Sequence, residues 1–231
     1  MPVPQPAPVI NASEADLPRS AHMVYDTTGT ARFAGISLTL HGITTTDWHF
    51  DGGHFESSLR NDTAEFGQTS AGRFLVDAGL EPERYTEKRR HRTIVATTFD
   101  WGGRQISFSD SPAVLPSEPG IQDRLSVQFQ LAVLRQADPA RFIPGVQFWI
   151  TVAGTHDLSQ WLITVRGDET LDTPRGIVHT TRIQSSRPQA DSSEAMDMWL
   201  DADLHWFPTR VRLVDSNGDV IDSILHSVAL E

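Results

Sequence analysis

Residue types that perform chemistry are present in this 231-residue chain, but few of them stand at a diagnostic spacing. The closest pair among its nine histidines is His49 and His54, with the turn signal Asp51-Gly52-Gly53 between them. A zinc site needs three or four histidine, cysteine or carboxylate ligands, and no third ligand accompanies this pair. The chain has no cysteine, which excludes disulfides and thiolate metal sites. We therefore expect no metal site and no cofactor.

Signatures of hydrolases and calcium sites are missing or incomplete. The chain has no Gly-x-Ser-x-Gly, His-Glu-x-x-His or phosphate-binding glycine motif. The stretch Asp215 to Asp219 begins like a calcium loop, which needs a glycine at its sixth position and a glutamate at its twelfth. Here Gly218 is the fourth residue and His226 the twelfth, so a hairpin turn explains the stretch better. We expect no catalytic residue, and an unrecognised hydrolase is the least favoured function.

The most specific polar feature is the segment Gly120 to Ser126, which contains Asp123 and Arg124. An aspartate and an arginine at the start of a buried helix are costly unless they are paired. One interpretation is that Asp123 or Arg124 faces a cavity and fixes the polar end of a ligand. The other, which the residue types favour, is that Asp123 supports the amino end of the helix while Arg124 binds carbonyl groups nearby.

Five of the six tryptophans fall in or beside expected strands, namely Trp101, Trp149, Trp161, Trp199 and Trp206. They either line an apolar groove for a ligand or fill the core between helix and sheet, and core filling is the more common role. If the protein binds a ligand, we expect the binding residues to be Trp101, Asp123, Arg124, Trp149 and Trp161.

Turn signals at hairpin spacing predict that these residues are carried by an antiparallel sheet. The signals are Thr28-Gly29, Asp51-Gly52-Gly53, Gly79 with Pro82, Trp101-Gly102-Gly103 and Asn217-Gly218. Between them, apolar residues alternate with polar ones, as in Ile36, Leu38 and Leu40. A period of two with one apolar face is typical of a sheet packed on one side.

The segment Gly120–Gln136 has the period of a helix instead. Ile121, Leu125, Phe129 and Ala132 form one row, and Val127, Leu131 and Leu134 form a second row on roughly the opposite side. Apolar residues on two sides imply burial on both. We therefore expect a mainly β fold, in which a strongly curved antiparallel sheet, a half-barrel or open barrel, wraps around one central α-helix near 120–136. Residues Asp110 to Glu118 would form the loop that leads into it.

Composition limits the remaining possibilities. Residues 1–20 begin with alternating prolines and read as a disordered linker, and 21–231 as a single domain. The net charge of −11 repels phosphate backbones, so we expect no nucleic-acid partner. The basic run Glu87 to Arg92 is either a patch for an anion or a lipid headgroup or the exposed face of a strand, and its shortness favours the strand face. No apolar run is long enough to span a membrane.

Several short motifs occur together and in order: Gly79 to Tyr85, Phe99-Asp100, Gly120 to Val127, Gly167 to Leu171, Met198 to Leu200 and Phe207 to Arg212. In this set the chain resembles the bacterial family of domain of unknown function 3108, from about Tyr25 to Leu225. The resemblance implies an exported, periplasmic envelope protein of Gram-negative bacteria. It also implies an architecture similar to the lipoprotein carriers of the LolA/LolB kind. The family has no established catalytic residues to carry over.

Our leading hypothesis is a non-enzymatic periplasmic protein that binds an apolar or amphipathic partner in the concavity of its sheet. The partner would be a lipid, an acyl chain, a lipoprotein or a lipidated peptide. The alternative is a structural module for envelope integrity that binds another envelope protein or peptidoglycan, with its interior simply a core. An open apolar cavity between helix and sheet favours the first hypothesis, and a dry packed interface favours the second.

Overall fold

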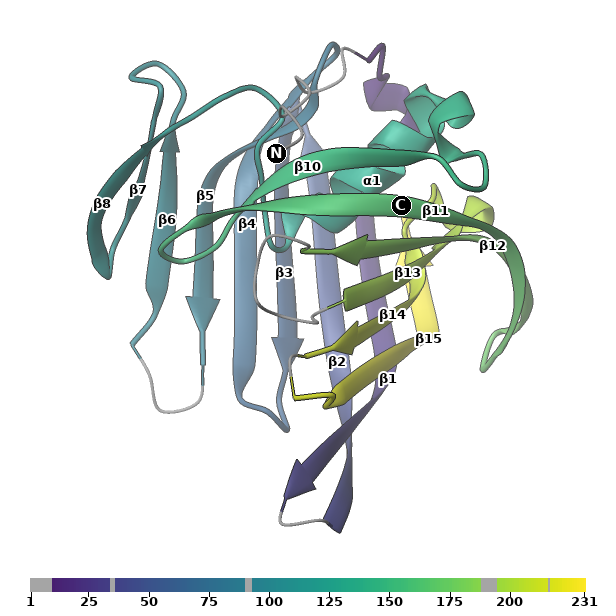
Figure 1. Ribbon diagram of the computed structural model, residues 1–231. Coiled ribbons are helices and arrows are strands. Elements are labelled where there is room, and N and C mark those ends of the chain that lie inside the picture. The colour runs from purple at the N-terminus through teal and green to yellow at the C-terminus, as the bar shows by residue number, and fades with distance from the viewer. Residues whose placement is uncertain (1–9, 34–35, 90–92, 188–194, 216) are drawn as a thin grey trace.

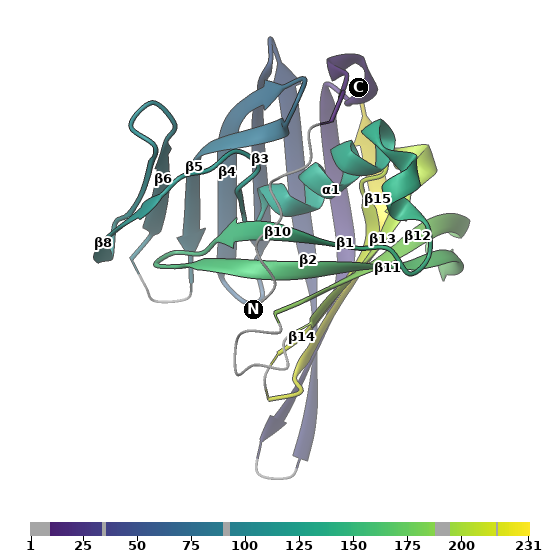
Figure 2. The same ribbon diagram turned by 45° about the horizontal axis from the view of Figure 1, so that its top comes forward.

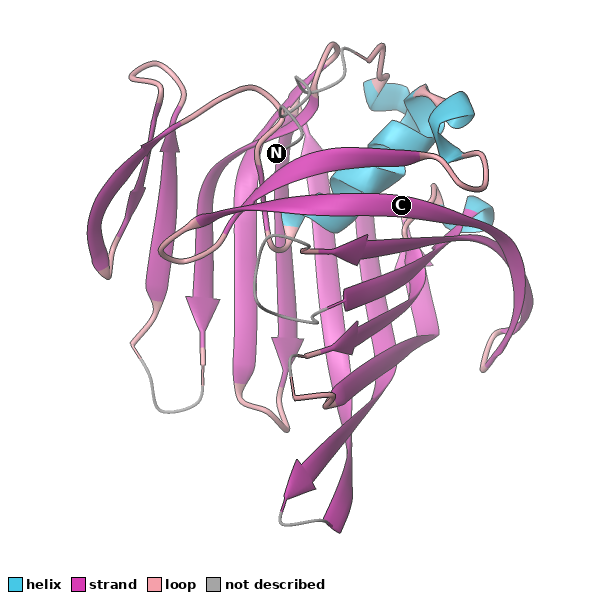
Figure 3. Cartoon of the chain, in the orientation of Figure 1, coloured by secondary structure: helices cyan, strands magenta, loops and turns pink. Residues whose placement is uncertain are grey.

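The computed structural model describes residues 10–33, 36–89, 93–187, 195–215 and 217–231. These residues form one sheet of 15 strands, one α-helix and three short 3-10 helices (Figures 1 and 3). The strand order is β8-β7-β6-β5-β4-β3-β2-β1-β15-β14-β13-β12-β11-β10-β9, and all neighbours are antiparallel except β9 and β10. The sheet is strongly curved but does not close, because β8 and β9 are its two edges. The predicted mainly β fold with an open, curved sheet is confirmed.

The first half of the sheet contains the strands β1 (Ser20–Phe33), β2 (Ile36–Asp51), β3 (His54–Asn61), β4 (Phe66–Leu75), β5 (Gly79–Lys88), β6 (Val95–Asp100), β7 (Gln105–Phe108) and β8 (Ser111–Pro116). The second half contains β9 (Gln122–Asp123), β10 (Gln147–Ala153), β11 (Leu158–Thr173), β12 (Gly176–Ser186), β13 (Ala195–Asp201), β14 (Pro208–Val214) and β15 (Val220–Leu230). The helix α1 (Ser126–Ala137) follows β9, and the 3-10 helices are Glu14–Asp16, Pro139–Phe142 and Ala202–Leu204.

Alternation of residue types explains which face of each strand is buried. On β2, Trp48 and Phe50 are buried while His49 between them is exposed, as a period of two requires. Two glycines in the left-handed region, Gly52 at φ 57° and Gly53 at φ 79°, close the predicted turn to β3. The inward face of the strands so formed is the concave face of the sheet.

Helix α1 is buried on two sides. Its Phe129 ring lies 4.7 Å from Trp48 and 5.0 Å from Phe207, measured between centroids. In Figures 1 and 2, α1 lies between the β1–β5 part of the sheet and the β10–β11 hairpin. Gln130 fastens the helix to the start of β5, because its Oε1 accepts from the N–H of Leu80 and its Nε2 donates to the carbonyl of Ala78, each at 2.8 Å.

The helix begins later than the sequence predicts. Residues Gln122–Asp123 form strand β9, and α1 starts only at Ser126. The Asp123 Oδ1 atom accepts hydrogen bonds from the backbone N–H groups of Leu125 and Ser126, both at 2.8 Å. In return, Ser126 Oγ accepts from the N–H of Asp123 at 2.9 Å. These reciprocal contacts satisfy the N–H of Ser126, the first helical residue, from outside the helix, so the residues before it can remain extended.

The predicted linker over residues 1–20 is wrong for residues 10–20. Ile10 and Ala12 are buried, and their N–H groups donate to Asp77 and Val76 carbonyls at 3.0 and 2.8 Å. Their apolar side chains pack into the core despite the prolines nearby, so this segment belongs to the fold. Residues 1–9 lie outside the described residues.

Two other predicted boundaries also differ. Gly29 is not in a turn but inside β1, opposite Leu40 of β2 and Ile221 of β15. Pairing on both sides outweighs the turn preference of a single glycine there. The expected loop Asp110 to Glu118 contains β8, whose prolines are tolerated because it is an edge strand.

Replacing Phe129 with alanine tests the two-sided burial. We expect Phe129→Ala to lower the free energy of unfolding by about 3–5 kcal/mol, because it leaves a cavity between two aromatic rings. Urea denaturation followed by circular dichroism measures this. The control Val114→Ala, at a side chain 57% exposed, should change stability by less than about 0.5 kcal/mol. Equal effects of the two variants would contradict the assigned burial.

Candidate functional site

A row of mostly apolar residues crosses the concave face from β11 to β2. The strand register places side by side, in order, Ile163, Ser185, Met196, Leu213, Ile221, Gly29 and Leu40. Met196 is two residues from the buried Met198, and Gly29 is four residues from the buried Tyr25. Since side chains alternate between the two faces of a strand, the row lies on the same concave face as these two core residues. We call this set of residues, together with Leu38 on the same face of β2, the apolar row.

Exposure rises along the apolar row. Ile163 is fully buried, whereas Leu213 is 41% exposed, Ile221 48% and Leu40 62%, and Leu38 is 53% exposed. The concave face is therefore covered at β11 and open toward β15, β1 and β2. Adjacent exposed apolar side chains on one face are typical of a binding surface rather than of ordinary surface residues.

A band of hydroxyl groups separates the apolar row from the aromatic core. Thr27 Oγ1 shares hydrogen bonds with Thr44 Oγ1 at 2.8 Å and with Ser223 Oγ at 2.9 Å. Val211 and Met198 continue the same cross-strand line toward β12. Because these hydroxyl groups satisfy one another, they do not require a polar ligand.

The structure buries Asp123 completely and ties it to three elements. Its Oδ2 atom accepts from Ser70 Oγ of β4 at 2.6 Å, and its Oδ1 atom caps α1. The residue itself pairs with Ala153 of β10. Burial raises the pKa of Asp123 from 3.8 to about 6, although the hydrogen bonds from Ser70 and the backbone act in the opposite direction. Its geometry is that of a helix cap and strand anchor.

The side chain of Arg124 lies in a different part of the structure, and about a quarter of its surface is exposed. Its Nη1 atom lies 3.7 Å from Glu87 Oε2, beyond hydrogen-bond distance. A Cβ atom on Gly154 would lie 2.5 Å from Asp157 Oδ1 and 3.0 Å from Arg124 Nη2, so this glycine leaves the space that both side chains occupy. Arg124 therefore lies at the β10–β11 turn, where the concave face begins.

Four tryptophans, apart from Trp48 and Trp199, have separate environments. Trp101 stacks on Phe99 and donates from Nε1 to the Pro82 carbonyl at 2.7 Å, so its polar atom is used within the fold. Trp161 pairs with Ile150 and shares its concave side, and Trp149 pairs with Leu162 on the opposite face. Trp206 lies under the guanidinium of Arg135. Of the five residues expected to bind a ligand, Arg124 and Trp161 lie toward the covered β11 end of the concave face, and none lies beside the exposed part of the apolar row.

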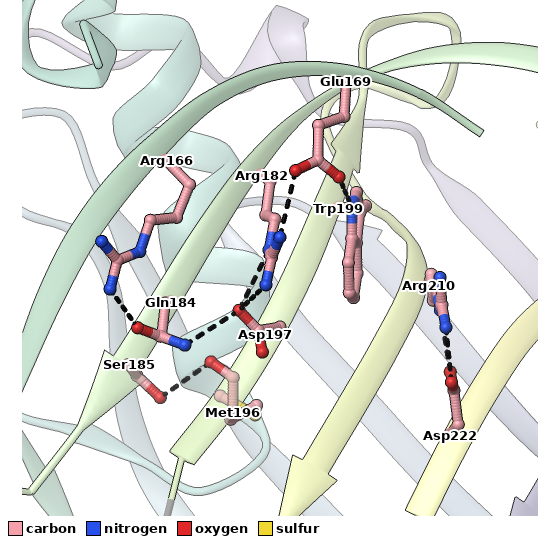
Figure 4. Close-up of polar contacts among 10 residues, drawn as sticks. All are labelled: Arg166, Glu169, Arg182, Gln184, Ser185, Met196, Asp197, Trp199, Arg210 and Asp222. Atoms are coloured by element: carbon pink, nitrogen blue, oxygen red, sulfur yellow. Dashed lines mark hydrogen bonds and ion pairs between the residues drawn. The ribbon is translucent and has the colours of Figure 1, made fainter. Parts of the chain in front are cut away.

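The convex face carries a set of bonded polar side chains that the sequence analysis missed (Figure 4). We call this set the polar ladder, and its members are Glu169, Arg182, Asp197, Trp199, Arg210 and Asp222. Trp199 stands between Arg182 and Arg210, whose guanidinium carbons lie 5.1 and 4.6 Å from its ring. Its Nε1 donates to Glu169 at 2.7 Å, and Arg182 bonds both Glu169 and Asp197. Every group drawn has a protein partner, so this ladder stabilises the register of β11 to β15 rather than offering a free site.

Both missed features depend on contacts between strands that are distant in sequence. The apolar row uses Leu38 and Leu40, whose alternation was visible, but a sequence does not show that the concave face is open beside them. The ladder joins Glu169 and Trp199 from two segments of the family resemblance, and a pattern of charged residues facing out from successive strands is the signal that would find it.

No group of three or more histidine or carboxylate side chains within the described ranges is arranged to hold a metal ion. Likewise, α1 and the other helices of those ranges are too short and too polar to cross a membrane.

Replacing Asp123 tests its burial through pH dependence. In the folded protein this carboxyl binds its proton up to about pH 6, and in the unfolded chain only to about 3.8. Its contribution to stability is therefore present at low pH and is lost as the pH rises through about 6. Asp123→Asn stays neutral, so its unfolding free energy should rise relative to the wild type by about 2–3 kcal/mol between pH 4 and 7. Urea denaturation at several pH values gives the unfolding free energy of both proteins. If the two free energies change with pH in the same way, the prediction is wrong.

The ladder makes a separate prediction. Arg182→Ala leaves the carboxylate of Asp197, which is 6% exposed, without its charged partner and should cost about 1–3 kcal/mol. Arg166→Ala, which removes an exposed side chain that donates to Gln184, should change stability by less than about 0.5 kcal/mol. Thermal unfolding of both variants decides the point. If Arg182→Ala and the wild type have the same melting temperature, the ladder does not stabilise the sheet.

Comparison with known proteins gives one family and one informative fold. A family model described as "Protein of unknown function (DUF3108)" matches residues 43–223, the family that the motifs indicated. No curated protein sequence matches the chain. The structure is similar to a β-barrel-like protein of domain of unknown function DUF1849 from Brucella abortus, with a TM-score of 0.58 and 11% identity over 93% of this chain and 99% of that one. This similarity shows a shared fold.

Two further solved structures are similar at lower scores. One is a DUF1329 family protein from Desulfovibrio piger, with a TM-score of 0.40 and 10% identity over 94% of this chain and 88% of that one. The other is a putative outer membrane lipoprotein-sorting protein domain from Vibrio parahaemolyticus, with a TM-score of 0.30 and 7% identity over 92% and 85%. Both scores are too low to support a functional argument.

Proposed function

Since this chain belongs to the DUF3108 family of proteins of unknown function, we propose for it a role that needs no catalytic residue. It is a periplasmic, non-enzymatic protein of the cell envelope. It binds an apolar or amphipathic ligand, such as a lipid, an acyl chain or a lipidated peptide, in the concavity of its sheet. Helix α1 fills one end of that concavity, and the ligand occupies the other.

The observation that carries the proposal is the exposure of the apolar row. Leu40, Leu213 and Ile221 are each more than two-fifths exposed on the face that elsewhere forms the core. Each of these side chains gains on the order of 1 kcal/mol when a ligand removes its remaining apolar surface from water. Covering several of them at once supplies the driving force for binding an acyl chain.

The buried polar groups near α1 support a non-enzymatic role. Ser70 and Asp123 are hydrogen-bonded, but they are only 1% and 0% exposed, so a substrate would not reach them. Tyr85 donates to Glu87 in the same region, and burial raises its pKa far above the ordinary value. A raised pKa keeps the tyrosine neutral, as a structural hydrogen-bond donor requires.

A second candidate is a protein-interaction module, which the packing of α1 favours. Val127, Phe129 and Leu131 are fully buried, and the space between α1 and residues 12–17 is about 10 Å³, room for about one water molecule. In this version another envelope protein covers the apolar row. Binding of a free lipid separates the two candidates, because only the first predicts it.

A neutral lipophilic probe tests the proposed function. We expect N-phenyl-1-naphthylamine to bind the purified protein and hexadecanol to displace it. Leu40→Asn should weaken probe binding about fivefold, and Leu40→Asn with Leu213→Asn by more than about tenfold, because each removes apolar surface from the row. Fluorescence titration gives these affinities, and native mass spectrometry after gentle purification shows any retained lipid.

The matched control is Ile43→Asn on the same strand. Ile43 is 48% exposed but lies opposite Asp26, on the face away from the concavity. This variant should bind the probe as the wild type does. A wild-type protein that binds neither the probe nor hexadecanol would contradict the proposal and favour the interaction module.

A further inference from the structure

The outer face of the β10–β11 hairpin presents one tryptophan between two amide–hydroxyl pairs. Figures 1 and 2 show α1 on one side of this hairpin, and the face opposite Ile150 and Trp161 points away from the helix. On that outer face the register places Trp149 opposite Leu162. The two pairs, one on each side of Trp149 along the strands, are Gln147 with Thr164 and Thr151 with Gln160. We call these residues, with Trp149 and Leu162, the hairpin patch.

Trp149 is partly exposed and has no bonding role inside the fold. Its Nε1 atom donates to no described group and is not buried, and no aromatic ring in the described ranges packs against it. By contrast, the Nε1 atoms of Trp48, Trp101 and Trp199 all donate within the fold. A surface tryptophan without such contacts is typical of a binding surface, where one large and rigid side chain supplies much of the contact area.

Both glutamine side chains of the hairpin patch keep hydrogen-bonding groups available. Gln147 Nε2 donates to Thr164 Oγ1 at 3.1 Å, and Gln160 Nε2 donates to Thr151 Oγ1 at 2.7 Å. These bonds fix the direction of each amide and leave its Oε1 atom without a partner among the described residues. Each amide nitrogen also has a second hydrogen to donate. The patch therefore offers an oriented acceptor and an oriented donor on either side of the indole.

The hairpin patch is uncharged in a strongly acidic chain. Strand β10 and residues 158–165 of β11 contain no charged side chain, although the net charge of the chain is −11. A ligand that placed a charge here would lose hydration without gaining an ion pair. The surface therefore suits an uncharged partner that is rich in hydrogen-bonding groups.

A sugar ring matches this combination of side chains. Its C–H groups lie on the faces of the ring and are polarised by the neighbouring oxygens, so the negative face of an indole attracts them. Its hydroxyl groups project from the edge of the ring, and each of them can donate and accept, as an amide can. Neighbouring side chains on one face of a strand are about 7 Å apart. A ring stacked on Trp149 therefore has one amide–hydroxyl pair beyond each of two edges.

We propose that the hairpin patch binds an uncharged sugar chain. One ring stacks on Trp149, and hydroxyl groups of that ring and of its neighbours bond to Gln147 and Gln160. This site is separate from the proposed lipophilic site, because the exposed end of the apolar row lies on β14, β15, β1 and β2. The two ligands therefore bind independently of each other.

Titration with cellotetraose and with tetra-N-acetylchitotetraose tests the proposal. The two probes have the same linkage and number of rings, and only the second carries acetamido groups. We expect at least one of them to bind with a Kd of about 1 mM or lower and to shift the indole N–H resonance of Trp149 in a heteronuclear NMR spectrum. Raising the salt concentration from about 0.05 to about 0.5 M should change this Kd by less than about twofold, because no charge takes part.

Variants assign the binding to the hairpin patch. Trp149→Ala should weaken binding of the better tetrasaccharide by about tenfold or more, whereas Trp149→Tyr, which keeps an aromatic face, should stay within about threefold of the wild type. Gln160→Leu removes one amide and should weaken binding about fivefold. The control Ile177→Ala, at a side chain 72% exposed outside the patch, should have no effect. Melting temperatures close to that of the wild type show that each variant is folded.

The two binding sites are tested separately. Failure of both tetrasaccharides to bind at about 10 mM, or binding unaffected by Trp149→Ala and Gln160→Leu, would overturn the sugar site. A steep dependence of the Kd on salt would also overturn it. The apolar row is unaffected by these results, since Trp149→Ala should bind N-phenyl-1-naphthylamine as the wild type does, and Leu40→Asn should bind the tetrasaccharide as the wild type does.

Discussion

The need to bury helix α1 on two sides is the constraint on which the rest of the structure depends. Its apolar residues occupy opposite sides, and a flat sheet covers only one of them. The sheet therefore curves until Trp48 of β2 and Phe207 before β14 meet the same side chain, Phe129. Asp123 fixes where this happens, because one carboxylate caps the helix and bonds to Ser70 of β4.

The same curvature leaves an open end. Helix α1 has 12 residues, about 18 Å at the usual rise, whereas β2 has 16 residues, about 53 Å, so the helix does not extend along the whole concave face. Beyond it the concave face of β1, β2, β14 and β15 retains apolar side chains that no described residue covers fully. The proposed ligand site is thus the part of a hydrophobic face that the short helix leaves free.

Sequence periodicity was enough to predict the antiparallel strands, the helix and the hairpin turn at Asp215 to Asp219, because each depends on local residue order. The curvature of the sheet was inferred from the two apolar sides of that helix. The helix start at Ser126 was missed because the cap comes from Asp123, three residues upstream. The grouping of Glu169 with Trp199 depends on register across strands. Local patterns do not determine which strands become neighbours, nor which stretch of a face stays open to solvent.

Methyl chemical shifts of the protein titrated with hexadecanoate test the central claim most directly. The account predicts that the methyl resonances of Leu38, Leu40, Leu213 and Ile221 shift together at one saturable stoichiometry. It also predicts that Ile43 and Ile177, exposed to a similar or greater extent away from the row, do not shift. Shifts at Ile43 and Ile177 of the same size, or no shifts along the row at saturating ligand, would contradict the account.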